Sequence, residues 1–127
     1  TALTPPNREA TKMTLPKDIL IDALVEASTA AIEATAEPMY ITDGSKVYTI
    51  EDGPCGFGWV NIRPARGKFI TYLKKMGIGT RDSYYGGYTV YSQARTQSMA
   101  KNFAWASAFA EVLNQHGIKA TAHQRMD

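Results

Sequence analysis

Basic and aromatic side chains alternate along one stretch of the second half of the chain, and these residue types suit a phosphate-rich ligand. Lysine and arginine neutralise phosphates, while flat aromatic rings give unpaired bases a surface on which to stack. The pattern predicts a ligand-binding surface for nucleic acid, built by Trp59, Arg63, Arg66, Lys68, Lys74, Lys75, Arg81, Tyr85 and Tyr88. The alternative is that Trp59 lies in the core and that the lysines are ordinary solvated residues of a helix.

Charge is divided unevenly between the two halves of the chain. The net charge is +2, but residues 1–52 hold four basic residues against nine carboxylates, and residues 53–127 hold ten against three. This asymmetry favours an anionic partner for the second half. The simpler interpretations are two halves that partly neutralise each other, or two solvated faces of opposite sign.

Other residues with reactive side chains form weaker patterns. Cys55 would form a thiolate pair with His116 or His123 if one of them lay beside it, but nothing in the spacing brings them together. The two histidines and Asp127 match no known metal-binding spacing. The glycines around Cys55 precede a predicted strand, whereas a phosphate-binding loop follows a strand and opens a helix. We therefore expect a non-enzymatic protein with no catalytic residues, no metal and no cofactor.

Length and composition bound the fold that must position these residues. The chain has 127 residues, of which 44% are hydrophobic and 20% charged, as is usual for one globular domain. No apolar run approaches the roughly 20 residues that a membrane span needs, so we expect no membrane association. The polar segment with Pro5 and Pro6 predicts a flexible arm over residues 1–14. We predict that residues 15–127 form a single α+β domain.

The first part of that domain is predicted to be a helix and a short hairpin. Apolar residues at helical spacing predict an amphipathic helix that begins at Pro16 and ends before Pro38. Because this helix is rich in alanine, its packed face is narrow and allows another element to approach closely. Asp43-Gly44 between two β-prone runs predicts the turn of a β-hairpin.

The second part is predicted to run β-α-β-α-β, with its helices packed on one sheet. Gly77 suits the residue after a helix, and Ser98 suits an N-cap. Gly86-Gly87 in the middle of the second predicted strand implies a bulge or a close backbone approach. The predicted elements are strand 57–63, helix 68–76, strand 82–92, helix 97–116 and a last strand from 118.

Residues 55–127 carry motifs that are rich in glycine and aromatic residues. These are Cys55-Gly56-Phe57-Gly58-Trp59-Val60-Asn61-Ile62, Lys74-Lys75-Met76-Gly77, Asp82-Ser83-Tyr84-Tyr85-Gly86-Gly87-Tyr88, Gln97-Ser98-Met99 and Arg125-Met126-Asp127. The pattern resembles a family of small proteins encoded in bacteriophage genomes. The resemblance implies a viral accessory role in the host cytoplasm or the virion, and it supplies no catalytic residues.

Two alternatives to nucleic-acid binding stay open. Seven tyrosines and an acidic helix face suit a protein-protein interaction module, such as a virion component or an inhibitor of a host factor. A protein partner or a homo-oligomer is compatible with that interpretation. A small phosphate-metabolite or nucleotide binder lies between the two, and it predicts a pocket near Trp59 and Gly86-Gly87.

Overall fold

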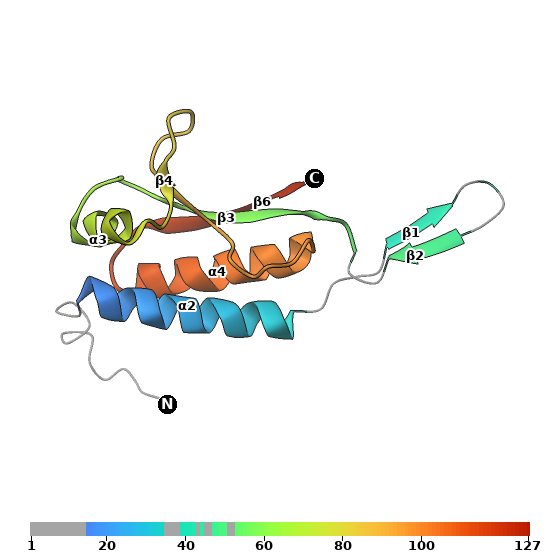
Figure 1. Cartoon of the computed structure of the whole chain (residues 1–127), viewed down its shortest axis with the longest axis horizontal. Helices are drawn as coiled ribbons and strands as arrows, with labels where there is room; N and C mark the ends of the chain where they lie inside the picture. Colours follow the sequence, from blue (N-terminus) through green and yellow to red (C-terminus); the bar gives the residue numbers. More distant parts are fainter. Residues whose placement is uncertain (1–14, 35–38, 43, 45–46, 51–52) are drawn as a thin grey trace.

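The computed structural model describes residues 15–34, 39–42, 44, 47–50 and 53–127 (Figure 1). The flexible arm predicted for residues 1–14 lies outside these residues. In chain order the elements are α2 (Pro16–Glu33), β1 (Met39–Thr42), β2 (Val47–Ile50), β3 (Gly56–Ile62), α3 (Lys68–Met76), β4 (Thr80–Arg81), β5 (Tyr88–Tyr91), α4 (Met99–Gln115) and β6 (Ala120–Met126). In the described part of the chain, no helix combines the length and the apolar character needed to cross a membrane.

The strands form two antiparallel sheets. β1 and β2 pair as the predicted hairpin, with Met39 opposite Ile50. The other four strands form one sheet in the order β4-β5-β3-β6. Since β3 and β4 are both antiparallel to β5, they run parallel to each other and α3 connects them across β5. In the same way α4 connects β5 to β6 across β3, and this connectivity is the split β-α-β, or ferredoxin-like, arrangement.

The α+β class and the packing of helices on one sheet are confirmed, but the predicted β-α-β-α-β order is wrong at one point. Residues 82–92 are not a single strand, because a turn over 82–87 separates β4 from β5. Gly86 and Gly87 have φ angles of +84° and +81°, a left-handed conformation that reverses the chain at little cost for glycine. The predicted bulge is therefore a hairpin turn. The predicted close approach is confirmed, since a Cβ on Gly87 would lie 2.8 Å from the carbonyl oxygen of Ile62.

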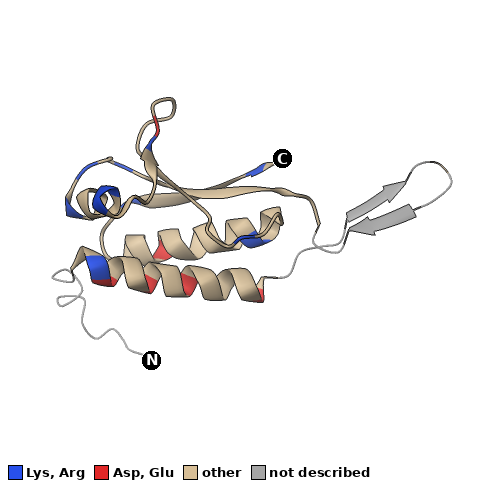
Figure 2. Cartoon of the chain, viewed as in Figure 1, with Lys and Arg blue, Asp and Glu red and all other residues tan. Residues whose placement is uncertain are grey.

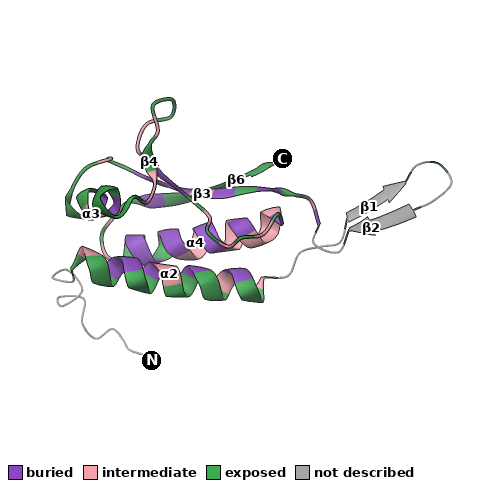
Figure 3. Ribbon diagram, in the orientation of Figure 1, coloured by how far each residue is buried: buried purple, intermediate pink, exposed green. Residues whose placement is uncertain are grey.

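Helices α2 and α4 lie side by side along one face of the four-stranded sheet (Figure 1). The buried face of α2 includes Ala23, Ala27 and Ala31, so the narrow alanine stripe does bring α2 close to α4. α4 supplies the larger side chains, among which the rings of Trp105 and Phe109 stack with centroids 4.9 Å apart. The helices are buried where they face the sheet or each other and exposed on their outer sides (Figure 3).

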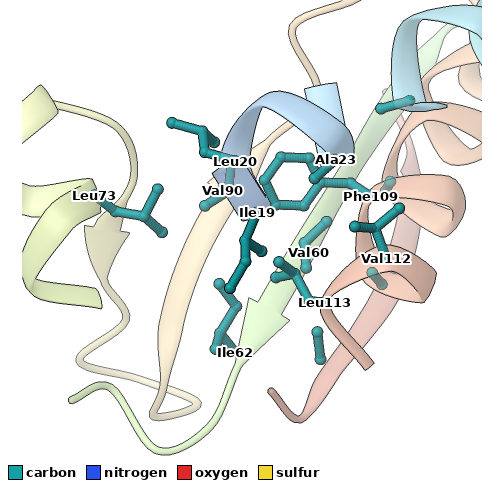
Figure 4. Close-up of a cluster of buried hydrophobic side chains, with 14 of the residues drawn as sticks. Ile19, Leu20, Ala23, Val60, Ile62, Leu73, Val90, Phe109, Val112 and Leu113 are labelled. Carbon is teal, nitrogen blue, oxygen red and sulfur yellow. The ribbon is translucent and has the colours of Figure 1, made fainter. Parts of the chain in front are cut away.

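The core lies between this helical layer and the sheet (Figure 4). Val60 and Ile62 of β3 point toward the helices, as does Val90 of β5, and all three are almost fully buried. The inward side of β3 also carries Gly58, whose position leaves no room for a side chain. A Cβ there would lie 2.4 Å from the backbone oxygen of Asn102 in the first turns of α4. Glycine at this position therefore sets how closely α4 approaches the sheet.

Helices α3 and α4 carry the capping residues predicted from the sequence. Ser98 caps α4, its side chain accepting a hydrogen bond from the backbone N–H of Lys101. Gly77 follows α3 with a left-handed φ of +73°, and its N–H donates to the last turn of that helix. Both predicted caps are confirmed.

Candidate functional site

The face of the sheet opposite α2 and α4 is covered by no helix among the described residues (Figure 1). Because side chains alternate along a strand, the residues between the core positions of β3, β5 and β6 point to this side. We call it the open face. Its residues are Phe57, Trp59, Asn61, Thr89, Tyr91, Thr121, His123 and Arg125.

Three rings form a row across the centre of the open face. The strand register places Tyr91 and His123 opposite Trp59 on its two sides. The Trp59 and Tyr91 centroids are 5.8 Å apart at an interplanar angle of 44°, and the Trp59 and His123 centroids are 5.6 Å apart at 21°. Trp59 is half-buried by these neighbours, while Tyr91 is 57% exposed. We call Tyr91, Trp59 and His123 the aromatic row. Trp59 therefore lies on an accessible surface, and the alternative that it belongs to the core is wrong.

A second aromatic residue of β3 extends this surface along the strand. Phe57 is 41% exposed, and the guanidinium carbon of Arg125 lies 5.6 Å from the centre of its ring. A guanidinium at this distance from an aromatic face is a cation–π contact, which holds the charged group beside the aromatic row.

The turn over residues 82–87 forms a wall at one end of the open face. Asn61 donates a hydrogen bond through Nδ2 to the carbonyl oxygen of Gly86 at 3.0 Å, and its Oδ1 accepts one from Nε of Arg63 at 2.9 Å. Arg63 also donates through Nη2 to the carbonyl oxygen of Tyr85 at 2.6 Å. These bonds fix the turn above the sheet and explain why the polar Asn61 is buried. Tyr85 stays exposed on the wall.

Asp82 begins this turn and holds its backbone in place. One oxygen of its carboxylate accepts hydrogen bonds from the backbone N–H groups of Tyr85 and Tyr84, both at 2.9 Å. These two bonds lower the pKa of Asp82 below its ordinary value of 3.8, with smaller contributions from Thr89 and Arg63. The carboxylate is therefore ionised at neutral pH.

The aromatic row and the wall enclose a depression of about 390 Å³. It brings together three of the predicted binding residues, Trp59, Arg63 and Tyr85. The full lining is Trp59, Asn61, Arg63, Asp82, Tyr85, Tyr91, His123 and Arg125. A separate depression of about 380 Å³ lies near the N-terminal end of α4 and holds none of the predicted residues.

Tyr88, one of the predicted binding residues, lies in the core and not on the open face. Tyr88 is opposite Ile62 in the sheet and so faces the core, where it is 2% exposed. Its hydroxyl donates to the carbonyl oxygen of Ile78 at 2.6 Å, and burial raises its pKa. A ring in this position offers no surface for stacking.

The remaining predicted residues are accessible but lie elsewhere. Arg66 precedes α3, while Lys68, Lys74 and Lys75 are on α3, which lies beside one end of the sheet (Figure 1). Arg81 is on the short edge strand β4. None of these five side chains lines the depression, although all are exposed.

Three residues that line the depression, Tyr91, His123 and Arg125, are not among those predicted from the sequence. The face that Tyr91 occupies is set by the register of β5 against β3, which the sequence does not show. His123 and Arg125 could have been predicted from the sequence. Ala120 and Ala122 mark one face of the last strand, so alternation places residues 121, 123 and 125 on the other face. What the sequence does not give is the pairing of that strand with β3.

The reactive groups considered from the sequence are not brought together. Cys55 is exposed, and its Sγ donates to Oε1 of Gln97 at 3.8 Å, whereas His123 stacks on Trp59. In the part of the chain that the structure describes, no three His, Cys, Asp or Glu residues lie close enough to hold a metal ion.

Most charges of the described residues are sorted by layer (Figure 2), with Lys17 of α2, Lys101 of α4 and Asp82 of the turn among the exceptions. The carboxylates of α2 are exposed along the helical layer, as is Glu111 of α4, while the basic residues around α3 and the open face lie on the sheet side. Among the described residues the one ion-pair geometry joins Asp22 to His116 at 3.9 Å. Among the described residues, the carboxylates of α2 form no ion pair with the basic residues of the sheet side, which fits two solvated faces of opposite sign.

Comparisons of this chain with models of protein families, with curated proteins and with solved structures find no match. The resemblance of residues 55–127 to bacteriophage proteins therefore stays a prediction.

Proposed function

We propose that this protein binds single-stranded nucleic acid on the open face without catalysing a reaction. The observation that carries the proposal is the aromatic row on a sheet surface that no described helix covers. Unpaired bases that stack on such rings gain about 1–3 kcal/mol per base. The bases of a duplex already stack on one another, so their faces are not available to the protein. The fold by itself implies no function, so the proposal depends on this site.

Two arginines supply the positive charge that a phosphate backbone needs. Arg63 and Arg125 both line the depression, at the wall and beside Phe57 respectively. A guanidinium has five N–H donors, and the bonds of Arg63 to Asn61 and Tyr85 use two of them. The remaining donors are free to bind phosphate oxygens. Asp82 also lines the depression and is ionised, so its charge offsets part of the positive charge of the two arginines. Its Oδ1 is engaged by backbone N–H groups of the turn.

The acidic helical layer favours approach of an anionic strand from the sheet side of the protein. An anionic strand is repelled by the exposed carboxylates of α2 and attracted by the basic residues of the sheet side (Figure 2). The basic residues of α3 and β4 then contribute to the long-range field and not to direct contacts. A viral accessory role in the host cytoplasm or the virion is consistent with this function.

A mononucleotide or another small phosphate compound is a second candidate ligand. The depression beside Trp59 and the 82–87 turn is the pocket that this alternative predicts, and its volume of about 390 Å³ is large enough for a small ligand. The two candidates differ in what they require, because only a strand gains from Phe57, which lies outside the depression.

The experiment is fluorescence anisotropy of a short labelled single-stranded oligonucleotide, of the corresponding duplex and of a labelled mononucleotide, each over a series of salt concentrations. We expect the single strand to bind more tightly than the other two. Two phosphate contacts predict a log–log salt slope of about −1.4, at roughly −0.7 per contact. Equal affinity for strand and mononucleotide would support the second candidate, and no binding at low salt would refute both.

Arg125→Gln tests the position of the site, with Lys75→Gln as its matched control. Both changes remove one exposed positive charge, but only Arg125 lines the depression. We expect Arg125→Gln to weaken single-strand binding and to reduce the salt slope by about 0.7. Lys75→Gln should change both quantities much less, and equal effects of the two variants would contradict the assignment of the open face.

A further inference from the structure

Among the described residues, the outer edge of β6 is the longest strand edge of the four-stranded sheet that no other strand pairs with. β6 and β4 are the two edge strands, and β4 has two residues whereas β6 has seven. β6 pairs with β3 along its whole length without a bulge, and it contains no proline and no lysine. Its one arginine, Arg125, lies opposite Phe57 and so points to the open face. Bulges, prolines and lysines are the usual means of blocking an edge, so this edge is open to pairing with another strand.

The register shows which backbone groups of β6 point outward. The N–H of Arg63 donates to the carbonyl oxygen of Lys119, and the N–H of Asp127 donates to that of Cys55. In an antiparallel ladder the hydrogen-bonded pairs alternate with non-bonded pairs. Residues 119, 121, 123, 125 and 127 therefore bond to β3, while 120, 122, 124 and 126 direct their N–H and C=O groups away from it.

The first outward position is already occupied by a side chain. Asn114 of α4 accepts a hydrogen bond from the N–H of Ala120 at 3.0 Å and donates one to its carbonyl oxygen at 2.9 Å. Its amide thus takes the place that a neighbouring strand would fill. Among the described residues, no such partner meets the outward groups of Ala122, Gln124 and Met126.

We propose that a second copy of this chain pairs with that edge, β6 against β6 in antiparallel orientation, with the two-fold axis at Gln124. In this register Gln124 faces its own counterpart and Ala122 faces Met126 of the other copy. Every outward N–H then meets an outward C=O, since all three pairs are of the hydrogen-bonded kind. The free segment begins after the position blocked by Asn114, which fixes the register.

Side chains at the edge fit the same two-fold arrangement. Residues 122, 124 and 126 lie on the helix side of the sheet, opposite Val60, Gly58 and Gly56, and none of them is charged. Met126 is 60% exposed and would cover the small Ala122 of the other copy. A self-complementary patch of this kind is the requirement for a two-fold interface, and an unrelated strand would not be selected by it.

The dimer would have one continuous eight-stranded sheet. A two-fold axis perpendicular to the sheet keeps both open faces on the same side, so the two aromatic rows would lie on one surface. This inference does not rest on the proposed function, because it follows from backbone groups that the open face does not use.

Sedimentation and light scattering of the full chain test the proposal, with Gln124→Pro and Gln124→Ala as a matched pair. Proline removes the outward N–H and leaves the bonds to β3 intact, whereas alanine keeps the N–H. We expect wild type and Gln124→Ala to reach twice the chain mass of 13.9 kDa as concentration rises, and Gln124→Pro to remain at the chain mass with an unchanged circular dichroism spectrum. A wild-type chain that stays monomeric, or a proline variant that dimerises as well as the alanine variant, would overturn it.

Cross-linking tests the register even if the proline variant does not fold. The Cα atoms of a hydrogen-bonded antiparallel pair lie about 5.5 Å apart, which allows a disulfide. In a Cys55→Ser background, Gln124→Cys should form a symmetric disulfide dimer on oxidation, and Lys119→Cys should not. Equal cross-linking of both variants, or of neither, would overturn the register and the proposal with it.

Discussion

Gly58→Ala should destabilise the fold by about 3 kcal/mol, because it places a Cβ where α4 crosses β3. That atom would lie 2.4 Å from the backbone oxygen of Asn102, 2.5 Å from its carbonyl carbon and 2.8 Å from the nitrogen of Phe103. Ordinary contact begins at 3.4 Å, so the helix must move away by about 1 Å. All three atoms belong to backbone, and no side-chain rotation relieves the overlap.

Two contributions make up this magnitude. Overpacking of a core costs about 1–3 kcal/mol. Moving α4 also strains the bonds of the buried Asn102, whose Nδ2 donates to the carbonyl oxygens of Gly56 and Thr96 and whose Oδ1 accepts from Ser92. Each such bond contributes about 1 kcal/mol. Alanine is intrinsically better than glycine in a strand by about 0.5–1 kcal/mol, which offsets part of the loss.

Urea unfolding followed by circular dichroism measures this change, and the melting temperature should fall on the order of 10 °C. Gly77→Ala is the control, because its Cβ meets nothing within 4 Å and only the left-handed φ of +73° opposes it, at about 1 kcal/mol. A Gly58→Ala protein within 0.5 kcal/mol of wild type would refute the close packing of α4 on β3 and with it the position of the helical layer.

Three further predictions follow from individual contacts. Tyr85→Ala should weaken binding of a single-stranded oligonucleotide several-fold in an anisotropy titration, whereas Tyr84→Ala should not, since only Tyr85 lines the depression. Because the folded state lowers the pKa of Asp82, its stabilising effect is present above pH 3.8 and is lost as the pH falls through the lowered value. Unfolding measured across that acid range should show this loss in wild type and not in Asp82→Asn. Asn114→Ala should cost about 1–2 kcal/mol in urea unfolding, because both backbone groups of Ala120 lose their partner.

Elements that depend on local chemistry could be predicted from the sequence. The helical spacing that begins at Pro16 gives α2, and Gly77 and Ser98 mark the end of α3 and the start of α4. The alternation around Trp59 also places its side chain on the face opposite Val60. These features depend on neighbours a few residues apart, which the sequence displays directly.

Features that depend on pairing between distant residues could not be predicted. Tyr88 and Tyr91 lie three residues apart in one short strand and therefore on opposite faces, but only the register against β3 shows which of them is core and which is surface. The β-prone tyrosines hid the turn that Gly86 and Gly87 make. The alternation of Ala120 and Ala122 predicts the faces of β6, but only its pairing with β3 brings His123 to the aromatic row.

The most direct test of the open face is the intrinsic tryptophan fluorescence of the protein titrated with a short single-stranded oligonucleotide. The chain has two tryptophans, and Trp105 is 1% exposed in the core while Trp59 lies in the aromatic row. Bases that stack on the row should quench Trp59 saturably, and Trp59→Phe should remove the quenching while retaining a surface for binding. Fluorescence that stays constant while the oligonucleotide binds, or quenching that persists in Trp59→Phe, would contradict stacking on the open face.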